Sequence, residues 1–447
     1  MLVYDAVAGA LPLLIISERY AFSPKFESEC QGGYAADLQT LRFAHREGSN
    51  PALSFSNYFW GNINLYFGTA MRNPWHCYVN LCLRYAQPLA LVCASGFGIV
   101  LFLEYLCNII VVCEMANLDL NSRFAVVGYG SWATTIVGKL TRNGIAVNWH
   151  VRSAEVIEGV LSEGFNPRYV RDMELDRSLL SISADIIEVV GASDVIVLCV
   201  PSAYLKSTLE PLTVSLQDKF IVSAIKGVVP GEYTTVLEYI HNAYGVSFKQ
   251  LGLISGPTHA EEVSRGKLSY LTSVCNSVED AEFIASALRS DTLRVSLSTD
   301  IYGVEYAGIL KNIYSIASGI AVGLGYGDNF LAVLISKSAA ELRHFLNTSY
   351  PYERNTSEVA YLGDLLVTCY SSLSRNRQFG MLIGRGCDVK SALNEMTMTA
   401  EGYYAARGIH HICTRHNISM PIAETVYRIL YDGEKARKAI VALSKTL

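Results

Sequence analysis

The chain has 447 residues, which is enough for two or three domains with cores of their own. Charged residues make up 17% of the sequence, below the roughly 25% of an average soluble domain, and the formal net charge is −5. This balance excludes the basic surface with which proteins bind nucleic acid nonspecifically, so we expect no nucleic-acid partner.

The first 114 residues differ in character from the rest. They hold six of the eleven cysteines and show neither helical nor strand periodicity over most of their length. Their one strong feature is the run QPLALVCASGFGIVLFLEYLCNIIVVC at 87–113, in which Glu104 is the only charge. By length and apolarity this run is a candidate transmembrane helix, and its distance from the N-terminus excludes a signal peptide.

The charges around this run argue against a working membrane anchor. Arg72 and Arg84 precede it and only Arg123 follows closely, so the positive-inside rule would place the C-terminal part outside the cell. We therefore interpret residues 1–114 as an extension that is not native to the protein, explained by a start codon upstream of Met115. A genuine anchor, and with it a membrane partner, is the first alternative, and an unfamiliar accessory segment is the second.

A short β-branched run, RFAVVG at 123–128, predicts a buried parallel strand. It leads into SWATTIVGKLTRNG, which has helical spacing and a stop signal at Asn143-Gly144. The turn between them, GYGSWA, is the GxGxxA form of the dinucleotide fingerprint. Gly128 allows the tight turn, Gly130 lets the backbone approach a pyrophosphate, and Ala133 lets the helix pack close to the strand. We expect this unit to bind NAD or NADP.

The second strand, IAVNWHVR at 145–152, should end near the ribose of the adenosine. An acidic residue there would favour NAD, but the chain has Arg152, which could pair with the 2′-phosphate of NADP. A solvent-facing arginine at a strand end is the alternative reading.

Strands and helices continue to alternate after this unit. The runs at 194–201, 219–227, 251–257, 268–274 and 292–298 read as further strands of one doubly wound sheet. From Ile301 the pattern changes to long helices. The sequence therefore predicts an α/β protein with three parts: the unrelated extension 1–114, a Rossmann-type dinucleotide-binding domain at 115–300 and an all-helical substrate domain at 301–447.

Several polar motifs interrupt these apolar elements. Lys226 follows a predicted strand, and Lys311 lies inside an otherwise apolar helix, where burial would lower its pKa. A lysine beside a dinucleotide domain could exchange the proton of an alcohol while hydride moves to nicotinamide, although a side chain that snorkels at the helix rim is the alternative. The run Ser374-Arg375-Asn376-Arg377, with Asp364 upstream, could bind a substrate phosphate or could be a solvated charge cluster.

The five cysteines after residue 114 are scattered and form no CxxC pair. Such sparse thiols suit a reducing compartment, so we expect a cytoplasmic protein without a metal site.

Taken together and in order, these motifs resemble bacterial NAD(P)-dependent glycerol-3-phosphate dehydrogenases. The resemblance covers residues 115–447 and runs through VVGYGSWATTIV, NPRYV, IKGVVPGE, ISGPTHAEEV, GVEYAGILKNIYSIASGI, LGDLLVTC, SRNRQFG and EGYYAARGI. It implies interconversion of sn-glycerol 3-phosphate and dihydroxyacetone phosphate, which supplies glycerol 3-phosphate for phospholipid synthesis. We also expect a homodimer.

The resemblance also implies roles for single residues. Lys311 would accept the proton, Lys226 would touch both cofactor and substrate, and Asp364 would sit beside Lys311. Ser374, Arg375 and Asn376 would bind the substrate phosphate, Gly256 and Thr258 would line the substrate pocket, and the cofactor would contact Gly128, Gly130, Ser131, Trp132, Arg152, Tyr169, Lys226, Ala260, Arg375 and Glu401. Lys337 and Thr399 depart from the family pattern.

Two other functions remain open from the sequence. The first is a related two-domain dehydrogenase acting on a hydroxyacid or a sugar-acid phosphate, which would not require the SRNR cluster. The second is a membrane-tethered NAD(P)-binding sensor without turnover, which would not need Lys226, Lys311 and Asp364 together.

Overall fold

The computed structural model describes residue 118, residues 122–396 and residues 399–447. The N-terminal extension and its apolar run at 87–113 lie outside these residues. Within the described ranges, no helix has both the length and the apolarity to cross a membrane.

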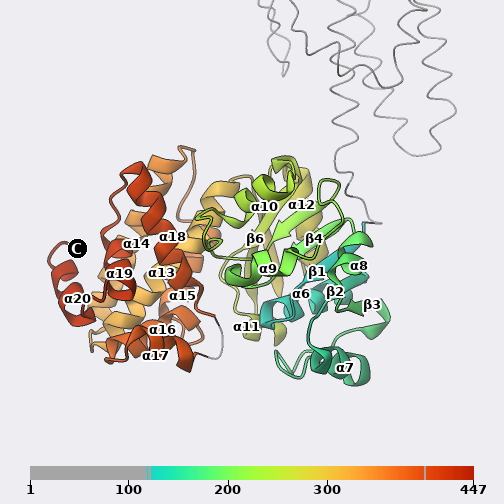
Figure 1. Ribbon diagram of the computed structural model, residues 1–447, viewed down its shortest axis with the longest axis horizontal. Helices are drawn as coiled ribbons and strands as arrows, with labels where there is room; N and C mark the ends of the chain where they lie inside the picture. Colours follow the sequence, from blue (N-terminus) through green and yellow to red (C-terminus); the bar gives the residue numbers. More distant parts are fainter. Residues whose placement is uncertain (1–117, 119–121, 397–398) are drawn as a thin grey trace, which may run out of the picture. The chain divides into compact units, whose positions relative to one another are not determined.

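The first part of the described chain is built on one eight-stranded sheet (Figure 1). The strand order is β3-β2-β1-β4-β5-β6-β7-β8, and all neighbours are parallel except β6 and β7. The strands are β1 (Phe124–Val127), β2 (Val147–His150), β3 (Leu180–Ser183), β4 (Val195–Leu198), β5 (Phe220–Ser223), β6 (Leu251–Ser255), β7 (Ser269–Cys275) and β8 (Leu293–Ser298). The order reverses between β1 and β4, and open α/β sheets bind their ligands at such a reversal.

Both faces of the sheet are buried, as the continuous apolar runs predict. In β1, Ala125 and Val127 join one hydrophobic cluster, whereas Phe124 and Val126 join another, because successive side chains of a strand point to opposite faces. Helices α8 (Ile186–Gly191), α9 (Leu205–Leu209) and α10 (Val236–Tyr244) contribute to the first cluster, and α6 (Ser131–Arg142), α7 (Ala154–Glu163) and α12 (Val278–Leu288) contribute to the second. A short helix, α11 (Ala260–Ser264), follows β6 and contacts α6.

One strand, β3, was not predicted from the sequence. β3 carries Leu180 and Ile182, which are only partly buried, and Ser181, which is exposed. This strand lies at the edge of the sheet and therefore lacks the continuous apolar run that marked the central strands.

The rest of the chain is helical. It comprises α13 (Ile301–Gly323), α14 (Asp328–Ser349), a π-helical turn η4 (Val359–Gly363), α15 (Asp364–Tyr370), α16 (Arg375–Gly384), α17 (Val389–Glu395), α18 (Glu401–His416), α19 (Pro421–Tyr431) and α20 (Ala436–Ser444). The prediction of a Rossmann-type sheet followed by a helical part is thus confirmed.

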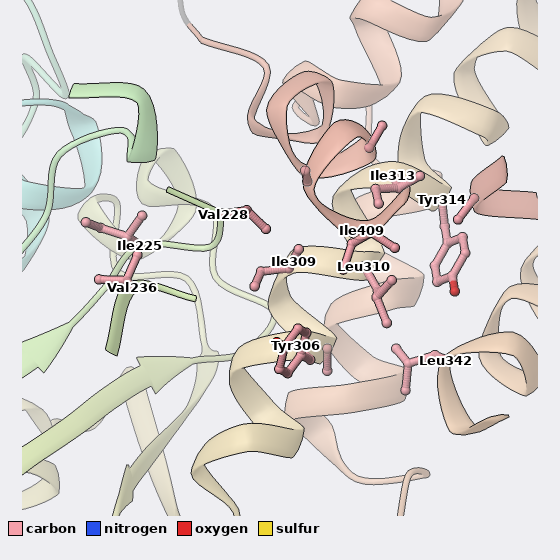
Figure 2. Close-up of a cluster of buried hydrophobic side chains, with 14 of the residues drawn as sticks. Ile225, Val228, Val236, Tyr306, Ile309, Leu310, Ile313, Tyr314, Leu342 and Ile409 are labelled. Atoms are coloured by element: carbon pink, nitrogen blue, oxygen red, sulfur yellow. The ribbon is translucent and has the colours of Figure 1, made fainter. Parts of the chain in front are cut away.

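Helix α13 is the central element of the helical part. It is buried along nearly its whole length, as expected for a helix that is apolar all round. Figure 2 shows Tyr306, Ile309 and Leu310 of this helix between side chains of the α/β part, such as Ile225 and Val228, and those of the other helices. The two parts therefore share one core, which fixes α13 against β6 and the loop after β5.

Candidate active site

The glycine-rich turn after β1 has the shape that a pyrophosphate requires. Gly128 has a φ of +119°, and a Cβ on it would lie 2.4 Å from the carbonyl oxygen of Cys199. Gly130 precedes α6, and a Cβ there would meet no atom within 4 Å, so open space lies over the turn. No side chain of the described residues caps α6, and its first turn carries no acidic residue. The first amides of the helix are thus available to an anion, and the turn fits a dinucleotide.

A cavity of about 690 Å³ opens from this turn toward the helical part. Its walls contain nearly every residue that the sequence analysis assigned to a site: Gly128, Gly130, Ser131, Trp132, Arg152, Tyr169, Lys226, Thr258, Ala260, Lys311, Asp364, Ser374, Arg375, Asn376 and Glu401. Residues from both parts of the fold, more than 270 positions apart in the case of Gly128 and Glu401, therefore face one space. The size is in the range of small-molecule and cofactor sites.

Gly256, which was predicted to line the substrate pocket with Thr258, is not among the residues that line this cavity, whereas Thr258 is. Its φ is +135°, and a Cβ on it would lie 2.9 Å from the carbonyl oxygen of Tyr270. Its own carbonyl oxygen accepts a hydrogen bond of 2.9 Å from Lys226 Nζ. Gly256 thus helps to position the Lys226 ammonium group through its backbone carbonyl oxygen.

Two lysines converge on one carboxylate. Lys226 Nζ lies 2.8 Å from Asp364 Oδ2, and Lys311 Nζ donates to the other oxygen, Asp364 Oδ1. Lys311 also donates to the hydroxyl of Thr368 at 3.0 Å. Asp364 and Lys311 are buried, and Lys226 is partly exposed to the cavity. One negative charge thus holds two amines at the wall of the cavity.

Burial sets the protonation of these groups. It lowers the pKa of Lys311 to about 7, and the nearby positive charge of Lys226 acts in the same direction while Asp364 opposes it. Burial would raise the pKa of Asp364, but the two ammonium groups outweigh it and hold this pKa below its usual range. Lys311 can therefore exchange a proton near neutral pH beside a carboxylate that stays ionised.

A close helix crossing brings the SRNR cluster to the cavity. In the contact between α13 and α16, a Cβ on Gly319 would lie 2.1 Å from the carbonyl oxygen of Arg377, and a Cβ on Gly380 would lie 2.2 Å from that of Ile316. The glycines let the two backbones touch. The N-terminus of α16, with Ser374 as its cap, then lies beside Ser315 of α13, and the two hydroxyl oxygens are 2.8 Å apart.

A chain of amide side chains joins the two parts of the fold at the wall of the cavity. Asn312 Nδ2 donates to the carbonyl oxygen of Lys226 at 2.8 Å, and Asn376 Nδ2 donates to Asn312 Oδ1 at 2.9 Å. The amide of Gly402 then donates to Asn376 Oδ1 at 2.9 Å. Each asparagine is fixed at both its oxygen and its nitrogen, so the loop after β5, α13, α16 and α18 keep one relative position.

Arg375 and Glu401 also face the cavity. Burial lowers the pKa of Arg375, and the charges of Glu261 and Glu401 oppose this effect. Burial raises the pKa of Glu401, whereas hydrogen bonds from the amide and hydroxyl of Ser202 lower it. Arg375 remains cationic and can bind a phosphate.

Sequence reasoning missed several polar residues of this site. Thr368 stands four positions after Asp364, and Ser315 stands four positions after Lys311. This helical spacing places each on the same helix face as the earlier residue, so both could have been predicted. His150 and His259 also line the cavity, and burial lowers the pKa of both. Of the two residues that depart from the family pattern, Thr399 lines the cavity and Lys337 is exposed on α14. Among the described residues, no group of three or more histidine, cysteine or acidic side chains is placed to hold a metal ion.

Comparison with known proteins agrees with this geometry. Residues 123–281 match the model of the NAD-dependent glycerol-3-phosphate dehydrogenase N-terminus, and residues 300–441 match that of its C-terminus. A glycerol-3-phosphate dehydrogenase [NAD(P)+] of Chlorobium limicola is 35% identical over 321 residues, which are 71% of this chain and 96% of the relative. A second such protein, from Salinibacter ruber, is 33% identical over 320 residues, 71% of this chain and 92% of that one.

The fold has a solved counterpart. The crystal structure of glycerol-3-phosphate dehydrogenase from Coxiella burnetii matches with a TM-score of 0.67 and 28% identity, covering 73% of this chain and 99% of that one. The chain is an oxidoreductase with a Rossmann-type NAD(P)-binding part, and it belongs to the NAD-dependent glycerol-3-phosphate dehydrogenase family.

Proposed function

We propose that the chain interconverts sn-glycerol 3-phosphate and dihydroxyacetone phosphate with NAD or NADP. The observation that carries the proposal is the buried pair of Lys311 and Asp364, supported by Lys226, in the cavity that begins at the glycine-rich turn. An alcohol oxidation needs a proton acceptor close to a hydride acceptor, and this cavity offers both positions.

Lys311 is the proton acceptor in this proposal. In its neutral form it takes the proton of the C2 hydroxyl, and in the reductive direction the ammonium returns this proton to the carbonyl oxygen. When bound, the nicotinamide supplies the acceptor for the hydride that leaves C2. Asp364 holds Lys311 in place and stabilises its charged form, and Lys226 reaches from the cofactor side toward the substrate.

The phosphate end of the substrate is assigned to Ser374, Arg375 and Asn376. Arg375 supplies a cation with planar donors, and it is the first residue of α16, so the amides of this helix N-terminus are close to it. Thr258 lines the substrate pocket, and Gly256 acts through its carbonyl contact with Lys226. A substrate with a carboxylate in place of a phosphate would not need this cluster, and the family match argues in the same direction.

The cofactor is assigned to the other end of the cavity. Gly128, Gly130, Ser131 and Trp132 would lie along the pyrophosphate, and Arg152 would lie near the adenosine ribose. The remaining contacts are assigned to Tyr169, Ala260, Arg375 and Glu401. Arg152 is exposed at the end of β2, where it could pair with a 2′-phosphate, so we expect NADP to be accepted.

The setting of the enzyme belongs to the same proposal. The described cysteines all carry free thiols, which suits a reducing cytoplasm. We propose a cytoplasmic homodimer that supplies glycerol 3-phosphate for phospholipid synthesis. Residues 1–114 have no role in this reaction.

The direct test is a substrate panel with the purified full-length chain. NAD(P)H formation is followed with glycerol 3-phosphate, glycerol and a 2-hydroxy acid such as lactate, each with NAD⁺ and with NADP⁺. We expect turnover with glycerol 3-phosphate and at least a hundredfold lower kcat/KM with the other two substrates. Equal or better turnover of the hydroxy acid would refute the proposal.

A further inference from the structure

A buried carboxylate at the start of α13 ties together three segments. Asp300 caps this helix by accepting from the amide of Gly303 at 3.0 Å. Its side chain also accepts from Arg354 Nε at 2.6 Å and from the hydroxyl of Tyr361 at 2.6 Å. Asp300 and Arg354 are both buried, so this is a desolvated ion pair; Arg354 Nη1 has no hydrogen-bond partner among the described residues.

The node touches both elements that carry the proton-transfer pair. Helix α13 carries Lys311, eleven positions after Asp300, and Tyr361 belongs to the π-helical turn η4, which runs directly into Asp364. The chain between α14 and η4 forms no regular element, and Arg354 fastens this stretch to the same carboxylate. π-Helical turns are rare and are found frequently at functional sites.

Asp364 is held from both of its sides. On its C-terminal side, Ser315 donates to the carbonyl oxygen of Thr368 at 2.8 Å, which ties α15 to α13. On its N-terminal side, the hydroxyl of Tyr361 donates to Asp300, the residue directly before α13, and this hydrogen bond ties η4 to the same helix. These two hydrogen bonds lie on either side of Asp364 in the sequence. Together they fix the position in which its carboxylate meets Lys311.

We propose that Asp300 is a positioning residue for the dehydrogenase reaction: through the hydroxyl of Tyr361 it fixes the π-helical turn that sets Asp364 against Lys311. The inference rests on the proposed function, because it assigns a task to the pair that this function uses. Asp300 itself does not line the cavity and touches neither substrate nor cofactor.

Loosening this tie has a consequence for the protonation of Lys311. The titratable groups that act on Lys311 or sense its charge are Asp364 of α15, Lys226 after β5, His259 before α11 and Cys369 of α15. Of these, Asp364 is the one that stabilises the ammonium. If the carboxylate moves away, burial and Lys226 remain, and the pKa of Lys311 falls further.

The variant that isolates this tie is Tyr361→Phe, which keeps the ring and removes the hydroxyl. The matched control is Tyr352→Phe, because the Tyr352 hydroxyl contacts Thr299 at 3.3 Å from the same irregular stretch but does not belong to η4. Asp300→Asn is the second variant, since asparagine is still a good helix cap but cannot hold both Arg354 and Tyr361 as the carboxylate does.

The measurement is kcat and KM for glycerol 3-phosphate oxidation across pH, on the full chain, with unfolding midpoints recorded in parallel. We expect Tyr361→Phe to lower kcat about tenfold and to move the acidic limb of the kcat profile to lower pH, with KM for the cofactor unchanged. Tyr352→Phe should match the wild type, and Asp300→Asn should show the same displaced limb as Tyr361→Phe. A loss of stability alone would lower the amount of active enzyme but would leave the limb where it is.

The outcomes are separable. If the wild type turns over and Tyr361→Phe retains its kcat and pH profile, or changes only its stability, the positioning role is wrong while the proposed function stands. If the wild type itself does not oxidise glycerol 3-phosphate, the proposed function is overturned and this inference with it.

Discussion

Asn312 and Asn376 lie 64 positions apart and bind each other side chain to side chain at 2.9 Å. Asn312 also holds the backbone of Lys226, and Asn376 holds the backbone of Gly402, so the pair links the loop after β5 to three helices at the wall of the cavity. Polar networks in a core are stabilising only when every member is satisfied, as these two amides are. The link explains how residues of two structural parts keep a fixed geometry around one substrate.

The rate of oxidation should depend on pH through Lys311. Oxidation requires the neutral amine, and the pKa of Lys311 is lowered to about 7, so kcat should rise as pH increases through about 7. Reduction requires the ammonium and should fall over the same range. Initial rates in both directions from pH 5.5 to 9 check this, and parallel profiles in the two directions would contradict it.

Arg375→Ala should weaken binding of the phosphorylated substrate. Removing a cation that binds a phosphate costs roughly 1.5–3 kcal/mol, which corresponds to an increase of about ten- to hundredfold in KM for glycerol 3-phosphate. The control is Arg385→Ala, because Arg385 is an exposed arginine at the end of the same helix and does not line the cavity. An unchanged KM in Arg375→Ala would remove this residue from the phosphate site.

Gly380→Ala should destabilise the helical part. The added Cβ would lie 2.2 Å from the carbonyl oxygen of Ile316, and backbone atoms cannot yield as a flexible side chain does. Overpacking of this kind costs about 1–3 kcal/mol in the free energy of unfolding, which urea denaturation measures. Gly191→Ala is the control, since its Cβ would meet the nearest side-chain atom at 3.8 Å and alanine is the better helix former. Equal stability of the two variants would show that α13 and α16 do not need this close contact.

A shortened chain that begins at Met115 should be as active as the full-length protein. The family match begins at residue 123, and 321 residues of this chain suffice to cover 96% of the relative from Chlorobium limicola. Expression of both chains and comparison of kcat/KM checks this expectation. A shortened chain that fails to fold would show that the extension belongs to the enzyme.

The sequence predicted those features that depend on local chemistry. The glycine-rich turn was visible because the positive φ of Gly128 and its close approach to Cys199 require glycine, and the central strands were visible because both of their faces are buried. Lys311 stood out because a lysine is costly to bury in an apolar helix. The edge strand β3, with its alternating serines, gave no such signal.

What the sequence could not predict depends on contacts between distant segments. The sequence around Gly256 does not indicate that its carbonyl oxygen accepts a hydrogen bond from Lys226. In the same way, the sequence around Tyr361 does not indicate its hydrogen bond to Asp300, 61 positions earlier. The π-helical turn before Asp364 likewise contacts α13 and β7, which lie far from it in the sequence. These contacts appear only when the two parts of the fold are assembled.

The central claim is tested most directly by one comparison: initial rates of glycerol 3-phosphate oxidation for the wild type and for Lys311→Ala, with cofactor affinity measured by nicotinamide fluorescence in both. We predict that the variant binds the cofactor with nearly unchanged affinity and loses turnover by a factor of about 10²–10⁴, because its proton acceptor is gone. A variant that oxidises the substrate at the wild-type rate would contradict the account.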